Sequence, residues 1–100
     1  MWWGVPAKVL KVEGFTALVD FGGGVEKEVL VATSDVHSGD YVLVHAGIIV
    51  SKIQREEVVK ILDAYKEMAV QLAVEEGLKR EDAERYYDGI LRDILGGEEV

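Results

Sequence analysis

The chain has 100 residues, of which 49% are hydrophobic and 30% charged, and its formal net charge is -8. This length suits a single domain, and no apolar run reaches the roughly 20 residues that cross a bilayer. The negative charge would repel a polyanion and the 11 basic residues are interleaved with acids, so no nucleic-acid partner is expected. The absence of cysteine excludes disulfides, thiolate nucleophiles and thiolate metal ligands.

The first half of the chain has the short, closely spaced β-rich runs of a small barrel. Turn residues separate these runs, notably at Glu13-Gly14, at Gly22-Gly23-Gly24 and in the polar loop from Ser34 to Asp40. Strands this short fit a closed sheet better than an open one, whose edges would need protection. We predict a mainly β fold, a five-stranded antiparallel OB-like barrel in residues 1–53, with strands at 5–12, 15–21, 25–31, 41–46 and 48–53.

The second half predicts helices. From Val58 to Leu72, through Tyr65, apolar residues recur at three- and four-residue steps, so residues 54–76 are expected to form a helix packed on the barrel. Gly77 is a suitable stop, and residues 77–100 form an additional segment of the same domain, with a second helix from about 81 to 95. The apolar stripe of that helix needs cover from the barrel, the first helix or another subunit. A homodimer through the second helix is therefore one prediction.

Side chains with catalytic or metal-binding chemistry are sparse. The two histidines, His37 and His45, lie eight residues apart, and the loop around His37 has the composition of a turn. A metal held by protein groups alone needs three or four ligands. We therefore expect no enzymatic activity, no bound metal and no resident cofactor. The three glycines precede a strand rather than a helix, so we interpret them as a hairpin turn and not as a phosphate-binding loop.

Two features predict a binding surface. His45 is an imidazole within the most strand-like run of the chain, and is either a strand residue bonded to a neighbour or a contact for a ligand or partner. The apolar start of the chain either caps the barrel or anchors a partner, because tryptophan often dominates binding energy. Pro6 favours an extended geometry at Val5 and so directs this segment. The predicted partner-binding residues are Met1, Trp2, Trp3, Val5, Pro6 and His45.

Three ordered motifs resemble the HypC/HybG/HupF family of hydrogenase maturation chaperones. They are the start from Met1 to Val9, the segment from Ala17 to Gly23, and the segment from Gly39 to Gly47 followed by a helix. The resemblance spans roughly residues 1 to 75 and implies an OB-like barrel with a C-terminal helix. It also implies an adaptor that binds an iron-sulfur partner, HypD, and the hydrogenase large-subunit precursor, and that helps to deliver the iron centre carrying cyanide and carbon monoxide. No secretory signal is recognised, so the cytoplasm is the expected compartment.

One position departs from the family pattern. Members normally begin Met-Cys, whereas Trp2 stands at that position, and an indole can neither ligate iron nor form a mixed disulfide. His45 matches the family histidine and is the candidate ligand that remains, but one imidazole is a poor metal site. The resemblance therefore implies an adaptor without cysteine-based iron transfer. Trp3 and the second helix favour a natural paralogue over a replaced cysteine. The alternative functions are an OB-like ligand-binding module and a self-associating structural protein unrelated to hydrogenase maturation.

Overall fold

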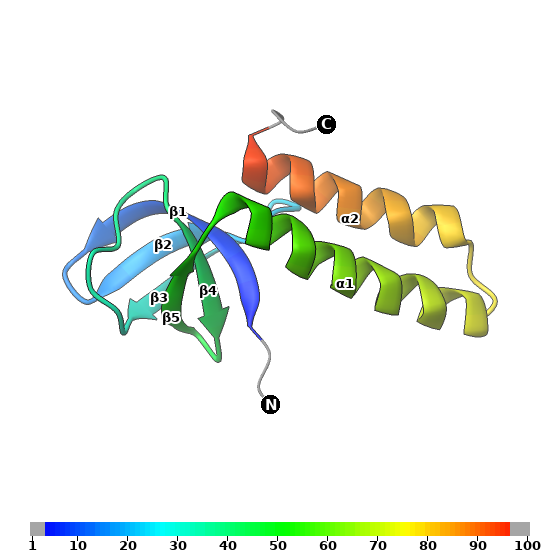
Figure 1. Cartoon of the computed structure of the whole chain (residues 1–100), viewed down its shortest axis with the longest axis horizontal. Helices are drawn as coiled ribbons and strands as arrows, with labels where there is room; N and C mark the ends of the chain where they lie inside the picture. Colours follow the sequence, from blue (N-terminus) through cyan, green and yellow to red (C-terminus); the bar gives the residue numbers. More distant parts are fainter. Residues whose placement is uncertain (1–3, 97–100) are drawn as a thin grey trace.

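The structure is a computed structural model that describes residues 4–96. These residues form five strands and two helices: β1 (Val5–Glu13), β2 (Thr16–Asp20), β3 (Glu26–Val31), β4 (Tyr41–His45), β5 (Ile48–Ile53), α1 (Arg55–Glu75) and α2 (Arg80–Leu95). The strands close into a barrel in the order β1-β2-β3-β5-β4. The helices lie side by side and extend away from the barrel (Figure 1). The predicted barrel and both helices are confirmed, and each strand end lies within one residue of its expected position.

Strand pairing in the barrel is mixed, which corrects the prediction of a purely antiparallel sheet. β3 and β5 run parallel, with Leu30 opposite Ile48 and Val31 opposite Ile49, whereas the other neighbouring strands within residues 4–96 pair antiparallel. The parallel pair arises because the chain crosses from β3 to β4 before β5 returns beside β3. Turn residues in the sequence reveal hairpins, but they do not reveal a pairing between strands that are separated by a third strand.

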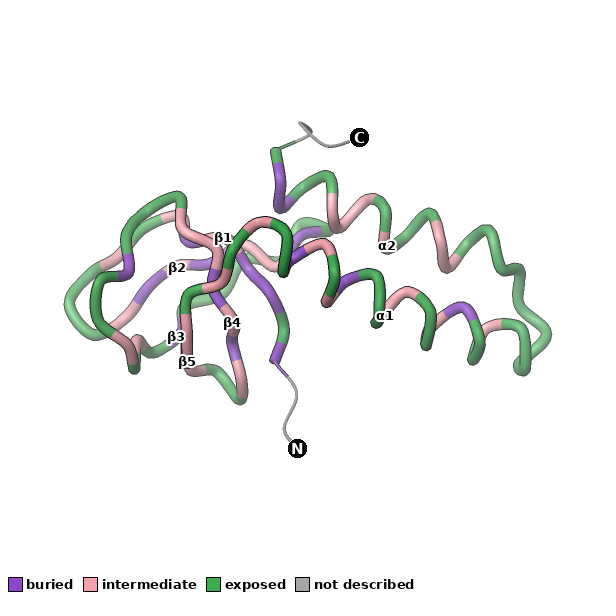
Figure 2. Tube along the Cα trace, in the orientation of Figure 1, coloured by how far each residue is buried: buried purple, intermediate pink, exposed green. Residues whose placement is uncertain are grey.

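The barrel interior holds small aliphatic side chains. In β4, Val42 and Val44 are buried while the alternating residues are only partly covered, as expected of a strand with one face on the core. A barrel of so few strands has room only for small side chains. Figure 2 shows the buried stretches along the strands. The core residues are Ala7, Val9, Ala17, Val19, Val29, Val36, Val42, Val44 and Ile49.

β1 pairs with a different neighbour in each of its halves. Residues from Val5 to Lys8 pair with β4, and residues from Lys8 to Glu13 pair with β2, with a register shift between Val9 and Lys11. Pro6 therefore lies where β1 is paired on one side only, a position at which a residue without an N–H donor is tolerated.

A second core joins the two helices to the barrel. Its buried residues are Val58, Leu62, Ile94 and Leu95, and Tyr41 and Ile53 of the barrel pack against them. The apolar stripe of α2 is thus covered within the same chain, so it offers no support for the predicted homodimer. Of the helices in residues 4–96, neither is long and apolar enough to cross a membrane.

The glycine turn between β2 and β3 is a further contact between the barrel and α2. The predicted hairpin turn is confirmed, since the Val25 N–H donates to the Gly22 carbonyl at 3.2 Å. A Cβ on Gly22 would lie 2.9 Å from the carbonyl oxygen of Ile90 in α2, so only glycine fits without displacement. The Gly23 N–H donates to an Asp93 carboxylate oxygen at 2.8 Å. The turn therefore closes a hairpin and also holds α2 against the barrel.

Candidate partner-binding site

The beginning of β1 lies beside the end of β4. Val5 is opposite Val44 and Pro6 is opposite Leu43, and the same register extended by one residue places Gly4 beside His45. A Cβ on Gly4 would overlap the Leu43 side chain, so the two strands approach closely here. The described part of the chain's first segment and His45 thus meet at one end of the barrel. Met1, Trp2 and Trp3 of the predicted surface lie outside the described residues.

The described residues of the predicted surface differ in exposure. Val5 is 44% exposed, whereas Pro6 is fully buried and cannot contact a partner while β1 keeps its place. The role left for Pro6 is to direct the backbone at Val5. His45 is half-buried at the end of β4, on the opposite face of the strand from Val44. The two-residue turn that follows has φ values of 51° at Ala46 and 80° at Gly47, positive at both positions as in a tight type I′ hairpin turn.

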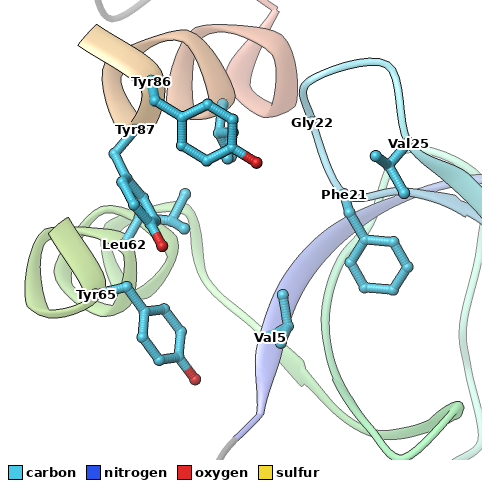
Figure 3. Close-up of a pocket in the computed structure, with 9 residues that line it drawn as sticks. Val5, Phe21, Gly22, Val25, Leu62, Tyr65, Tyr86 and Tyr87 are labelled. Atoms are coloured by element: carbon cyan, nitrogen blue, oxygen red, sulfur yellow. The ribbon is translucent and has the colours of Figure 1, made fainter. Parts of the chain in front are cut away.

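An apolar groove of about 340 Å³ opens next to Val5, between the barrel and the helices. We call it the tyrosine groove. Figure 3 shows the three tyrosines on the helix side of the groove, with the barrel residues across from them. Its principal lining residues are Val5, Phe21, Val25, Tyr65, Tyr86 and Tyr87.

A second hollow at the barrel mouth shares three of these residues, Val5, Phe21 and Val25. It continues to Ala46 and Gly47, the turn that directly follows His45. A surface that is mainly apolar, with Lys27 and Glu28 also lining the second hollow, therefore runs from this turn, past the beginning of β1, to the helices.

Tyr65 attaches α1 to the beginning of β1. Its hydroxyl donates to the Gly4 carbonyl at 2.5 Å, across 61 positions of sequence. Burial, and secondarily the neighbouring Tyr87, raise the pKa of Tyr65 above its ordinary value, so the hydroxyl keeps its proton at neutral pH. In the sequence, Tyr65 stands out only as part of the apolar stripe of the helix. A bond to a distant backbone carbonyl leaves no local pattern by which it could have been found.

The polar loop between β3 and β4 is stabilised by its own contacts. Asp40 accepts the His37 N–H at 2.8 Å and pairs with the Lys52 ammonium at 3.3 Å. The hydroxyl of Ser38 donates to the Leu10 carbonyl at 2.8 Å, which ties the loop to β1. Within residues 4–96 there is no group of three or more His, Cys, Asp or Glu side chains that could hold a metal ion.

A closed OB-like barrel with an apolar surface at its rim is the geometry of a small binding protein. Residues 1–65 match the model of the HupF/HypC family, so the chain belongs to this family. Its members are non-catalytic chaperones of hydrogenase maturation. The match covers the barrel and the first half of α1, and α2 lies beyond it. A search of curated proteins gave no match. Because the chain contains no cysteine, it has no thiolate with which to hold iron.

Proposed function

We propose that this HypC-family protein is an adaptor that binds a HypD-like maturation protein, a hydrogenase large-subunit precursor, or both. The partner surface consists of the first residues of the chain and the area around His45. Membership of the family supports the role in maturation. The observation that carries the single surface is the β1–β4 register, which brings Gly4 and Val5 to the end of β4 that holds His45.

The proposal assigns the contacts by side-chain chemistry. Met1, Trp2, Trp3 and Val5 supply apolar contacts, and tryptophan is the residue type that most often dominates binding energy at interfaces. His45 supplies a polar contact at the edge of this area, and Pro6 directs the segment without touching the partner. The cytoplasmic location stays a prediction. It is the compartment in which partners of this kind are expected.

The adaptor acts without a thiolate that could take up the iron centre. Trp2 offers an N–H donor and no lone pair for iron, and the chain contains no cysteine. In this proposal the iron centre is cargo that stays on the partners. The contribution of the chain is to hold the precursor or the HypD-like protein in place.

Binding measurements with purified partners test the proposal. The chain is immobilised and titrated with a HypD-like protein and with a large-subunit precursor from the same organism. Trp2→Ala should weaken binding by about thirtyfold, the loss of one dominant contact, and His45→Ala by about fivefold. His37→Ala, at the exposed histidine of the polar loop, is the matched control and should bind as the unaltered chain does. The proposal fails if neither partner binds, or if Trp2→Ala and His45→Ala bind as tightly as the control.

A further inference from the structure

The barrel has an open stretch along β3. This strand pairs with β2 from Glu26 to Leu30, but it pairs with β5 only at Leu30 and Val31. Within residues 4–96, the earlier part of β3 is therefore paired with a strand on one side only. An unpaired strand edge presents main-chain N–H and C=O groups to which another chain can bond.

The main-chain groups of Glu28 face this open side. The Val31 N–H donates to the Phe15 carbonyl, next to β2, at 2.8 Å. The Leu30 N–H donates to the Gly47 carbonyl, on the other side of β3, at 2.9 Å. Consecutive residues of such a strand direct their main-chain groups to opposite sides, so Glu28 faces the same side as Leu30. Its N–H and C=O are thus placed to bond to a strand added beside β3.

Two hollows lie along this edge. The second hollow, of about 350 Å³, is lined by residues of β3 as far as Val29. It shares Val25, just before β3, with the tyrosine groove. A segment that follows β3 from Val29 to Val25 therefore passes from one hollow to the other, over about 13 Å of extended chain. Side chains on one face of such a segment recur about every 7 Å, so they can enter both hollows.

The tyrosine groove favours an aromatic side chain. None of the described residues that line it carries a charge. The rings of Tyr86 and Tyr87 meet edge to face, with centroids 5.3 Å apart, and Phe21 stands across the groove (Figure 3). Aromatic walls on two sides favour a flat occupant. Tyr86 is 61% exposed and Val25 is 44% exposed, so an occupant that covers them removes apolar surface from water.

The outer face of β3 is acidic at the open edge. Val29 is buried in the core, so Glu28 and Glu26, at odd steps from it, lie on the outer face, where both are exposed. Lys27 lies on the same face as Val29 and lines the second hollow. Basic side chains on the outer face of an added strand would meet the two glutamates as cross-strand pairs of opposite charge, which are favourable.

We propose that the partner of this chain contributes an extended segment that adds to the open edge of β3 and places an aromatic side chain in the tyrosine groove. Apolar side chains of the segment face the hollows and alternate with basic ones on its outer face. The inference rests on the adaptor function proposed above, and it specifies how the partner binds. The two hollows are continuous with the proposed partner surface, since Val5 and the turn after His45 line them.

This mode of recognition uses residues outside the region that identifies the family. Tyr86 and Tyr87 belong to α2, whereas the family match ends at residue 65. The aromatic wall of the groove is thus supplied by the part of the chain that the family model does not cover. We therefore expect it to contribute to the choice of partner.

Amide hydrogen exchange, measured by NMR on the full chain, tests strand addition directly. The probe is the peptide acetyl-Lys-Phe-Lys-Val-Lys-amide, in which basic and apolar side chains alternate. At saturating peptide, exchange of the Glu28 N–H should slow about tenfold, the effect of one added hydrogen bond. The Leu30 N–H, which already bonds to Gly47, is the internal control and should exchange as before. Unchanged exchange at Glu28 would overturn the proposal.

Two variants with matched controls locate the contacts. Tyr86→Ala should weaken peptide binding about threefold to tenfold, the loss of one aromatic pair, whereas Phe15→Ala, at an 85% exposed residue beside the Val31 end of β3, should not. Glu28→Gln should weaken binding about twofold, whereas Glu76→Gln, at the end of α1 far from the barrel, should not (Figure 1). Circular dichroism verifies that each variant is folded. Equal effects of each variant and its control would overturn the proposal.

Titration of the same variants with the HypD-like protein and the large-subunit precursor separates this inference from the adaptor function. The partner that supplies the segment should bind Tyr86→Ala and Glu28→Gln more weakly and bind the two controls as it binds the unaltered chain. Equal binding of all four variants would overturn the inference and leave the adaptor function standing. Peptide binding at Glu28 without binding of either partner would overturn the adaptor function and leave the strand-binding edge.

Discussion

The contact between Gly22 and α2 can be separated from the backbone strain of the same turn by comparing two alanine substitutions. Gly22 and Gly24 have nearly the same positive φ, 85° and 83°. They differ in what a side chain would meet. A Cβ on Gly24 has nothing within 4 Å, whereas a Cβ on Gly22 would lie 2.9 Å from the Ile90 carbonyl oxygen and 3.1 Å from its Cα. Gly24→Ala is therefore the matched control for Gly22→Ala.

The expected magnitudes follow from these two contributions. An alanine in the left-handed region costs about 1–2 kcal/mol, and both variants carry this cost. Gly22→Ala must also displace the backbone of α2, which cannot rotate away as a side-chain end could, and overpacking of this kind costs about 1–3 kcal/mol. We expect the free energy of unfolding to fall by about 1–2 kcal/mol in Gly24→Ala and by about 2–5 kcal/mol in Gly22→Ala.

Urea unfolding of both variants measures the difference, and amide hydrogen exchange locates it. Amide exchange in α2 should be faster in Gly22→Ala and should stay near that of the unaltered chain in Gly24→Ala. Only the first variant disturbs the contact between the glycine turn and α2. If the two variants have equal unfolding free energies and equal exchange in α2, the glycine turn does not hold the helix and the reasoning is refuted.

Two further side chains give shorter tests. Tyr65→Phe removes the hydrogen bond to Gly4 and should lower the free energy of unfolding, measured in urea, by about 1 kcal/mol. The control Tyr86→Phe should change it by less than about 0.5 kcal/mol. Equal losses in the two variants would contradict the hydrogen bond. Burial raises the pKa of folded Tyr65, so its stabilisation is complete below the unfolded value of 10.0 and is lost as pH rises through the folded value. Urea titrations at increasing alkaline pH should show the gap between the unaltered chain and Tyr65→Phe narrowing, and a constant gap would contradict the shift. Ile94→Ala, at a fully buried position of α2, should lower the free energy of unfolding by about 2–5 kcal/mol in the same assay. Leu78→Ala, at an exposed position, should lower it by less than about 0.5 kcal/mol. Similar losses in the two variants would mean that α2 is not part of the folded unit.

The local features of the fold were predictable from the sequence because their causes are local. Glycine-containing turns and apolar runs placed the strands, and the three- and four-residue spacing from Val58 to Leu72 placed α1. The parallel pairing of β3 with β5 was not predictable in this way, since it depends on how the chain closes the barrel. The contacts of Tyr65 with Gly4 and of Gly22 with Ile90 likewise join distant parts of the chain.

In the candidate site, as in the fold, local features were predictable from the sequence and contacts between distant residues were not. Its two predicted parts, the apolar start and His45, were singled out because each is unusual in its local setting, but no local pattern predicts that Val5 lies beside the end of β4. Barrel closure between β1 and β4 supplies the reason. The tyrosine groove was missed, although one signal pointed to it. Tyr86 and Tyr87 are consecutive in a helix, so they lie about 100° apart and cannot both occupy one narrow stripe.

The placement of α2 links the stability of the fold to the beginning of the chain. The helix buries Ile94 and Leu95 against α1 and contacts the glycine turn through Ile90. The same helix supplies Tyr87, which lies near enough to Tyr65 to raise its pKa, and Tyr65 in turn holds the Gly4 carbonyl. Loosening α2 should therefore weaken the groove wall and the support of Gly4 together. The support of Gly4, at the start of the first strand and next to the proposed partner surface, is thus linked to a helix outside the residues that identify the family.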